Sequence, residues 1–171
     1  LPEDKKGFAL GKIYSEASKE SKDNETAKKM IEFMMKKIET RKGEEYKLWK
    51  KTRKWSIKGF DKIYEDLGID FDNTFYESDF IEDGKKEVKK LVKKGILEES
   101  QGAIIANLEK YDLGVLVIIR SDGTATYPVA DIPLAKYKLE KHKLDKSIIV
   151  VDNRQTLYFK QLFKILELMG Y

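Results

Sequence analysis

Polar side chains that could hold a small cation follow the apolar run Val115–Ile119. Tyr127 and Asp131 are four positions apart, so they share one face if a helix already begins near Tyr127. A carboxylate beside a phenol can bind a planar cation such as guanidinium through charge-assisted, bidentate hydrogen bonds. In a second interpretation, Asp131 caps a helix whose start is displaced by Pro128, and Tyr127 simply packs. Spacing alone leaves both interpretations open.

A second polar group follows the next apolar run, Ser147–Val151. Asp152 and Gln155 are three positions apart, the spacing of a helix capping box, in which two side chains bind backbone N–H groups of the first turn. Gln155 is therefore either a ligand-binding residue or part of a helix start. His142, the only histidine, lies at a lysine-rich helix end and is interpreted as a surface residue near the helix dipole.

Several kinds of site are absent from the sequence. Zero cysteines exclude disulfides, thiolate metal sites and a cysteine nucleophile. The sequence contains no glycine-rich phosphate loop of Walker or dinucleotide type, no metal-ligand spacing and no serine in a nucleophile-elbow motif. Most enzyme classes are therefore unsupported, and the polar groups after the two apolar runs are the remaining candidates.

The composition is that of a folded, rather polar globular protein. The 171 residues are 41% hydrophobic and 37% charged, enough for one core. The formal charge of +4 would tolerate a nucleic-acid partner without requiring one. Without an apolar run of about 18 residues or a signal peptide, we expect a cytoplasmic protein with no membrane association. Because the sequence opens at Leu1 and not at a methionine, we expect a piece of a longer protein.

The first part of the chain, residues 1–68, is predicted to be a helical segment. Apolar residues recur at helical spacing after Asn24, a plausible N-cap, and the methionines among them are interpreted as core packing. A longer amphipathic helix spans 44–67 and ends at Gly68, so the two helices form a hairpin. Residues 1–23 are predicted to be irregular or partly helical.

Residues 69–171 are predicted to form an α/β unit. The expected strands lie around 71–76 and at 103–108, 115–119 and 147–151, and the expected helices at 84–94, 131–142 and 155–169. The run at 115–119 is typical of a strand covered on both faces. Alternating strands and helices over the last 60 residues predict a parallel sheet with right-handed crossovers, whose ligands bind beyond the carboxyl ends of the strands.

The helix at 44–67 also carries a run of basic residues. These side chains could contact a phosphate backbone, but a solvated helix surface is the preferred interpretation because the overall charge is modest. They include Lys50, Lys51, Arg53, Lys54 and Lys58.

The longest stretches of the α/β part resemble a known family. The sequences Arg120-Ser-Asp-Gly-Thr-Ala-Thr-Tyr127, Ala130-Asp-Ile132 and Ile149–Phe163 resemble the second half of the arginyl-tRNA synthetase catalytic domain. Trp55-Ser56 and Tyr76-Glu-Ser78 resemble the same family in the same order. The similarity covers most of residues 10–171.

The resemblance implies a class I, Rossmann-like fold of the nucleotidylyl transferase type: three layers around a mostly parallel sheet, with an inserted helical hairpin. It implies that Tyr127, Asp131 and Gln155 bind L-arginine, with Asp131 facing the guanidinium. In this family arginine reacts with ATP and Mg²⁺, pyrophosphate leaves, and the arginyl group passes to tRNA(Arg). The complete protein is expected to be a monomer.

The sequence departs from the family pattern at two places. Val129-Ala130 stands where many relatives have a basic pair, and Tyr158 where many have histidine. The two ATP-binding signature motifs of the family are absent, so we expect the segment to have little or no ligase activity alone. The alternatives are a free-standing, non-catalytic arginine-binding paralogue and an RNA or protein interaction module.

Overall fold

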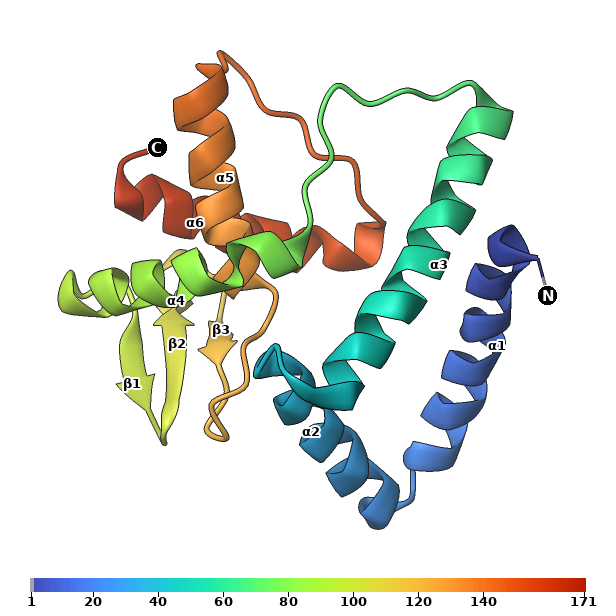
Figure 1. The fold of residues 1–171 in the computed structure, drawn as a ribbon. Helices are drawn as coiled ribbons and strands as arrows, with labels where there is room; N and C mark the ends of the chain where they lie inside the picture. The colour runs from blue at the N-terminus through green and yellow to red at the C-terminus, as the bar shows by residue number, and fades with distance from the viewer. Residues whose placement is uncertain (1) are drawn as a thin grey trace. The chain divides into compact units, whose positions relative to one another are not determined.

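A computed structural model describes residues 2–171, which divide into two compact units. The first unit ends at Asn73 and the second spans Thr74–Tyr171. The first is all helical, whereas the second combines helices with one small sheet (Figure 1). None of the helices in residues 2–171 is long and apolar enough to cross a membrane.

The first unit contains three helices: α1 (Glu3–Ser21), α2 (Glu25–Glu39) and α3 (Gly43–Leu67). The two predicted helices and their connection are confirmed. The Asn24 side chain accepts a hydrogen bond from Ala27 N at 3.0 Å and so caps α2. Gly68 ends α3 in the left-handed conformation, with φ of 64°.

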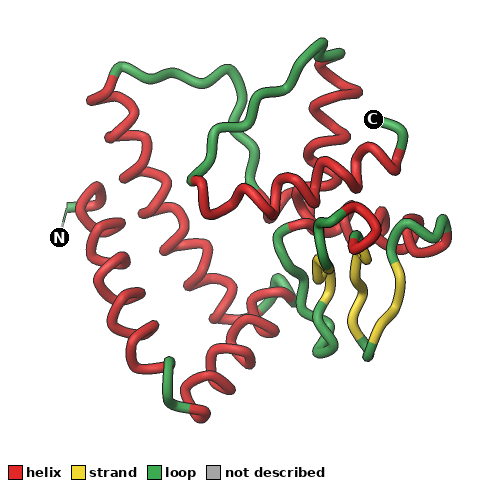
Figure 2. The backbone as a smooth tube through the Cα atoms, turned by 180° about the vertical axis from the view of Figure 1, so that it is seen from behind, coloured by secondary structure: helices red, strands yellow, loops and turns green. Residues whose placement is uncertain are grey.

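Where the sequence predicts irregular or partly helical structure, the chain forms the continuous helix α1, which packs along α3 (Figures 1 and 2). A Cβ added to Gly7 would lie 3.1 Å from the carbonyl oxygen of Trp55, so the two backbones approach closely there. Tertiary contact therefore stabilises a helix whose own apolar pattern is weak. The interpretation of the methionine face of α2 as core is wrong, because Met30 is 59% and Met35 47% exposed.

The second unit begins with a helix and continues with a three-stranded sheet, two further helices and two short 3-10 turns. In chain order these are α4 (Glu77–Lys93), β1 (Glu98–Ser100), β2 (Ala103–Asn107), η1 (Glu109–Tyr111), β3 (Val115–Ile119), α5 (Pro128–His142), η2 (Asn153–Gln155) and α6 (Thr156–Met169). The predicted helix at 84–94 begins earlier, at Glu77.

The sheet is antiparallel, with strand order β1-β2-β3, so a mostly parallel, three-layer Rossmann-like sheet is not what residues 2–171 form (Figure 1). The connections explain this result. Gln101 and Gly102, with φ of 49° and 78°, join β1 to β2 as a tight hairpin. Only residues 108–114 separate β2 from β3, whereas a parallel crossover needs about a dozen or more.

Three expectations about strands are also wrong. Residues 71–76 and 147–151 form no strand, and Val150 in the latter is 92% exposed. Strand β3 is covered on one face only, since Ile118 is buried while Val115 and Val117 are 46% and 40% exposed. Apolar, β-branched sequence favours extended backbone, but a strand also needs a hydrogen-bonding partner.

The core of the second unit lies between the sheet and the helices. It includes Val88 and Leu91 of α4, Ile118 of β3, Ile132 of α5 and Ile165 of α6. These apolar side chains fix how α4, α5 and α6 lie against one another, and the same three helices carry the polar residues described below.

Helices α4 and α5 approach closely at Gly84. A Cβ there would lie 1.6 Å from the carbonyl oxygen of Val129, so only glycine fits. Pro133 lies four residues after Val129 inside α5 and has no N–H to donate to that carbonyl. The sequence therefore leaves the carbonyl of Val129 without its helical partner at the point where α4 passes.

Candidate functional site

Hydrogen bonds hold the loop that leads from β3 to the start of α5. The carboxylate of Asp122 accepts hydrogen bonds from Thr124 N at 2.9 Å and Thr124 Oγ1 at 2.7 Å, around Gly123 with φ of 84°. Thr126 Oγ1 donates to the carbonyl oxygen of Val117 at 2.7 Å. These bonds fix the turn after β3, and so fix where α5 begins.

Tyr127 is the N-cap of α5, and Asp131 lies in its first turn. The backbone N–H of Asp131 donates to the carbonyl oxygen of Tyr127 at 3.1 Å, so the two residues are one turn apart. The interpretation of Asp131 as an N-cap is wrong, since Pro128 already occupies the first helical position. Tyr127 is 69% exposed, whereas Asp131 is half-buried.

The carboxylate of Asp131 accepts a short hydrogen bond from the hydroxyl of Tyr158 on α6. Burial, this hydrogen bond and the charge of Asp131 raise the pKa of Tyr158 well above its usual value, so its hydroxyl stays protonated. A protonated phenol is a hydrogen-bond donor to the carboxylate. Tyr158 therefore orients Asp131, a role that sequence analysis did not assign to it.

Glu77, at the start of α4, is the second carboxyl near this group. Its partial burial, and then the negative charge of Asp131, raise the pKa of Glu77. Within residues 2–171, neither Glu77 nor Asp131 forms an ion pair with a lysine or arginine. Two carboxyls and a phenol with no cation of their own suit a cationic ligand.

Among the described residues, Gln155 makes no hydrogen bond to Glu77, Asp131 or Tyr158. It ends η2, is exposed, and its backbone N–H donates to the carbonyl oxygen of Asp152 at 3.0 Å. The Asp152 carboxylate caps the turn by accepting from Arg154 N at 2.9 Å, and Arg154 Nε at 2.8 Å adds an ion pair. The turn ends three residues before Tyr158, so Gln155 precedes the α6 residue that binds Asp131.

The comparisons with known proteins bear on the whole chain. A model of the family described as class I tRNA synthetases (R), catalytic domain, matches residues 5–171. The chain belongs to this family. Arginine-tRNA ligase of Bdellovibrio bacteriovorus is 38% identical over 177 aligned residues, covering 100% of this chain and 30% of the relative. Arginine-tRNA ligase of Halothermothrix orenii is 36% identical, with coverage of 94% and 28%.

A solved structure supports the fold. Arginyl-tRNA synthetase from Plasmodium falciparum matches with a TM-score of 0.70 and 24% identity, over 83% of this chain and 25% of that one. This segment of the class I catalytic domain spans less than a third of the length of the curated relatives named above.

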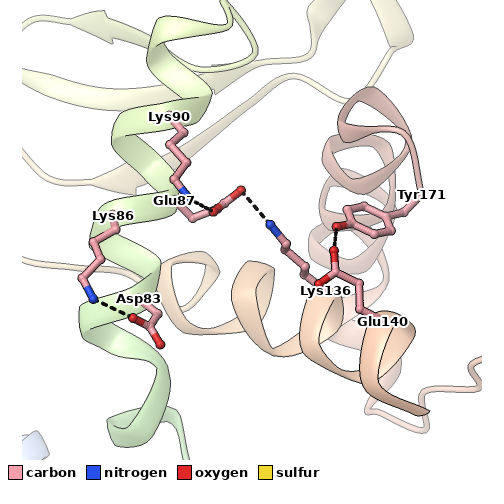
Figure 3. Close-up of polar contacts among 7 residues, drawn as sticks. All are labelled: Asp83, Lys86, Glu87, Lys90, Lys136, Glu140 and Tyr171. Atoms are coloured by element: carbon pink, nitrogen blue, oxygen red, sulfur yellow. Dashed lines mark hydrogen bonds and ion pairs between the residues drawn. The ribbon is translucent and has the colours of Figure 1, made fainter. Parts of the chain in front are cut away.

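A second polar group of this synthetase segment lies between α4 and α5, and its lysines pair with carboxylates of the same group (Figure 3). It lines a hollow of about 270 Å³. Glu87 binds Lys90 at 3.2 Å and Lys136 at 3.5 Å. Glu140 accepts a hydrogen bond from the Tyr171 hydroxyl. The cations here have anions of their own, so this group joins the helices, in contrast to the unpaired carboxyls at Asp131.

Side chains that could bind a metal ion do not cluster in the part of the chain that the structure describes. Among residues 2–171, no group of three or more histidine, cysteine, aspartate or glutamate side chains is placed to hold a metal ion. We therefore assign no residue of this chain to Mg²⁺.

Proposed function

We propose that this chain is part of an arginine-tRNA ligase, which activates arginine with ATP and transfers it to tRNA(Arg). The observation that carries the proposal is the family match over residues 5–171, together with curated relatives named arginine-tRNA ligase. In the complete enzyme Mg²⁺ accompanies ATP. The proposal includes a cytoplasmic, monomeric parent protein.

In this proposal the segment supplies arginine recognition. The carboxylate of Asp131 pairs with the guanidinium, because carboxylate and guanidinium form charge-assisted, bidentate hydrogen bonds. Tyr127, one turn earlier and exposed, lies over the same ligand, and Gln155 contacts it from the turn before α6. The Tyr158 hydroxyl keeps the Asp131 carboxylate in place before the ligand arrives.

An arginine titration of the 171-residue chain by calorimetry tests the proposal. We expect arginine to bind at least about tenfold more tightly than citrulline, which has the same length but no charge, and than lysine, which cannot pair bidentately. Equal binding of arginine and citrulline, or no binding of arginine, would contradict arginine recognition by this segment. Arginine-dependent exchange of pyrophosphate into ATP by the chain alone would contradict its role as one part of the catalytic fold.

The pH dependence of arginine binding gives a separate prediction. Because the pKa of Glu77 is raised in the folded chain, the folded chain holds this proton more tightly than the unfolded chain does. The contribution of protonated Glu77 to folding stability is therefore lost as pH rises through the raised pKa. A bound guanidinium favours the ionised carboxylate, so arginine binding releases a proton and weakens as pH falls. We expect affinity about three- to fivefold lower at pH 5 than at pH 7.5.

Glu77→Gln should remove most of this pH dependence and lower the affinity at pH 7.5, as measured by calorimetry across the same range. Glu82→Gln, an equal charge change on the exposed side of α4, is the control and should behave as the unaltered chain. A pH profile that is flat in the unaltered chain would show that Glu77 does not face the ligand.

A further inference from the structure

The hydrogen bond between Tyr158 and Asp131 does more than orient the carboxylate. A carboxylate that binds a cationic ligand has to be held in place without losing its charge to a cation of the protein itself. Within residues 2–171, Asp131 forms no ion pair with a lysine or arginine, and its side chain accepts a hydrogen bond from the Tyr158 hydroxyl. The group that holds Asp131 is therefore a donor and not a cation.

The core of the second unit fixes the position of the Tyr158 ring. The ring is partly buried against the apolar core and meets the ring of Phe159 edge-on, with 5.1 Å between the ring centres. Three residues further along α6, the Gln161 side chain donates to the carbonyl oxygen of Leu113 at 2.7 Å. These contacts set the rotation of α6, and so they direct the Tyr158 hydroxyl toward Asp131.

The Tyr158 hydroxyl keeps the same charge over a wide pH range. Burial, then the hydrogen bond to Asp131 and its charge, and then the charge of Glu77 raise the pKa of Tyr158 well above its usual value. Among the described residues, these two carboxyls, from α5 and α4, are the titratable groups that face the hydroxyl. The stability that the protonated hydroxyl contributes is present below the usual phenol pKa of about 10 and is lost only as pH rises through the raised pKa. Between about pH 5 and pH 9 the donor is therefore protonated and uncharged.

Other side chains at position 158 would not combine these properties. A lysine would be a cation at every pH in this range, and a histidine would become one as pH falls through its usual pKa of about 6.5. Either cation would pair with Asp131 and repel a cationic ligand. Phenylalanine would fill the same space but leave the carboxylate without its donor. Tyrosine combines a ring that packs in the core with a donor that carries no charge.

We propose that Tyr158 is a positioning residue that selects for cationic ligands. It holds the Asp131 carboxylate with an uncharged donor, so the negative charge of the site stays available to a guanidinium group. This inference rests on the proposed function, in which that group belongs to arginine. The side chain at position 158 then sets, together with Glu77, the pH range over which the ligand binds.

The test compares the 171-residue chain with Tyr158→Phe and Tyr158→His by calorimetric titration of arginine between about pH 5.5 and pH 8.5. Each affinity is divided by that of the unaltered chain at the same pH, which removes the contribution of Glu77. Tyr158→Phe should bind about tenfold more weakly at every pH, because the carboxylate loses one hydrogen bond. Tyr158→His should stay within about threefold at pH 8.5 and bind about 30-fold more weakly at pH 5.5, because the imidazolium then pairs with Asp131.

Tyr14→His makes the same substitution at an exposed position of α1 and should stay within about twofold of the unaltered chain at every pH. A pH profile of Tyr158→His that parallels the unaltered chain would overturn the inference, and so would unchanged affinity in Tyr158→Phe. The same titrations with methylguanidinium, a bare guanidinium cation, separate this inference from the proposed function. If methylguanidinium binds and arginine does not, only the proposed function is contradicted, and the Tyr158 variants are compared with methylguanidinium. Binding of neither cation contradicts both.

Discussion

Asp131→Asn is expected to weaken arginine binding by about 100-fold, or roughly 2.7 kcal/mol. Asparagine keeps the size of the side chain, and its carbonyl oxygen can still accept from the Tyr158 hydroxyl. The substitution removes the negative charge, and with it the charge-assisted pairing to guanidinium. Calorimetric titration of arginine into the variant measures the loss.

Asp145→Asn is the matched control, because it makes the same change at an exposed carboxylate that the proposed site does not use. Its arginine affinity should stay within about twofold of the unaltered chain. A second readout is independent of the ligand: since the charge of Asp131 raises the Glu77 pKa, Asp131→Asn should lower that pKa, as followed by carbon NMR. Unchanged arginine affinity would show that the ligand does not meet Asp131.

The local features of the fold were predictable because their causes are local. The Asn24 cap, the Gly68 stop and the turn around Gly123 each depend on one side chain or one positive φ. The sequence predicts only irregular or partly helical structure for the first residues, because the continuous helix α1 depends on a close approach between Gly7 and Trp55, far apart in the sequence.

The prediction of a parallel sheet was wrong for a different reason. The apolar pattern identified β2 and β3 correctly, but strand direction depends on the connection, and a seven-residue link permits only antiparallel pairing here. That signal was present in the sequence. By contrast, nothing local distinguishes residues 147–151, rich in isoleucine and valine, from a paired strand, because pairing depends on a partner elsewhere in space.

The candidate site also combines a local feature, which the sequence predicts, with contacts between distant residues, which it does not. The four-residue spacing placed Tyr127 and Asp131 one turn apart, and this required only that α5 begin at Pro128. Tyr158 reaches Asp131 across 27 positions, and Glu77 comes from another helix. No spacing rule joins such distant residues, so the acidic character of the group emerges only when α4, α5 and α6 pack.

Gly84→Ala tests that packing directly and should destabilise the second unit by about 3 kcal/mol or more. The new methyl group would lie 1.6 Å from the backbone oxygen of Val129, and a backbone atom cannot move aside as a flexible side chain can. For a unit of this size the midpoint of thermal unfolding should fall by about 15 °C. Circular dichroism during heating measures this shift.

Two controls separate a steric clash from the general effect of alanine. Gly11→Ala places a methyl group where no atom lies within 4 Å and should stabilise α1 by about 0.5–1 kcal/mol. Lys89→Ala changes an exposed position of α4 and should shift the midpoint by less than about 2 °C. Because α4 carries Glu77 and α5 carries Asp131, Gly84→Ala should also weaken arginine binding at temperatures where the chain remains folded. Unaltered stability would mean that α4 and α5 do not approach closely at Val129. The placement of Glu77 near Asp131, which depends on this approach, would then be unsupported.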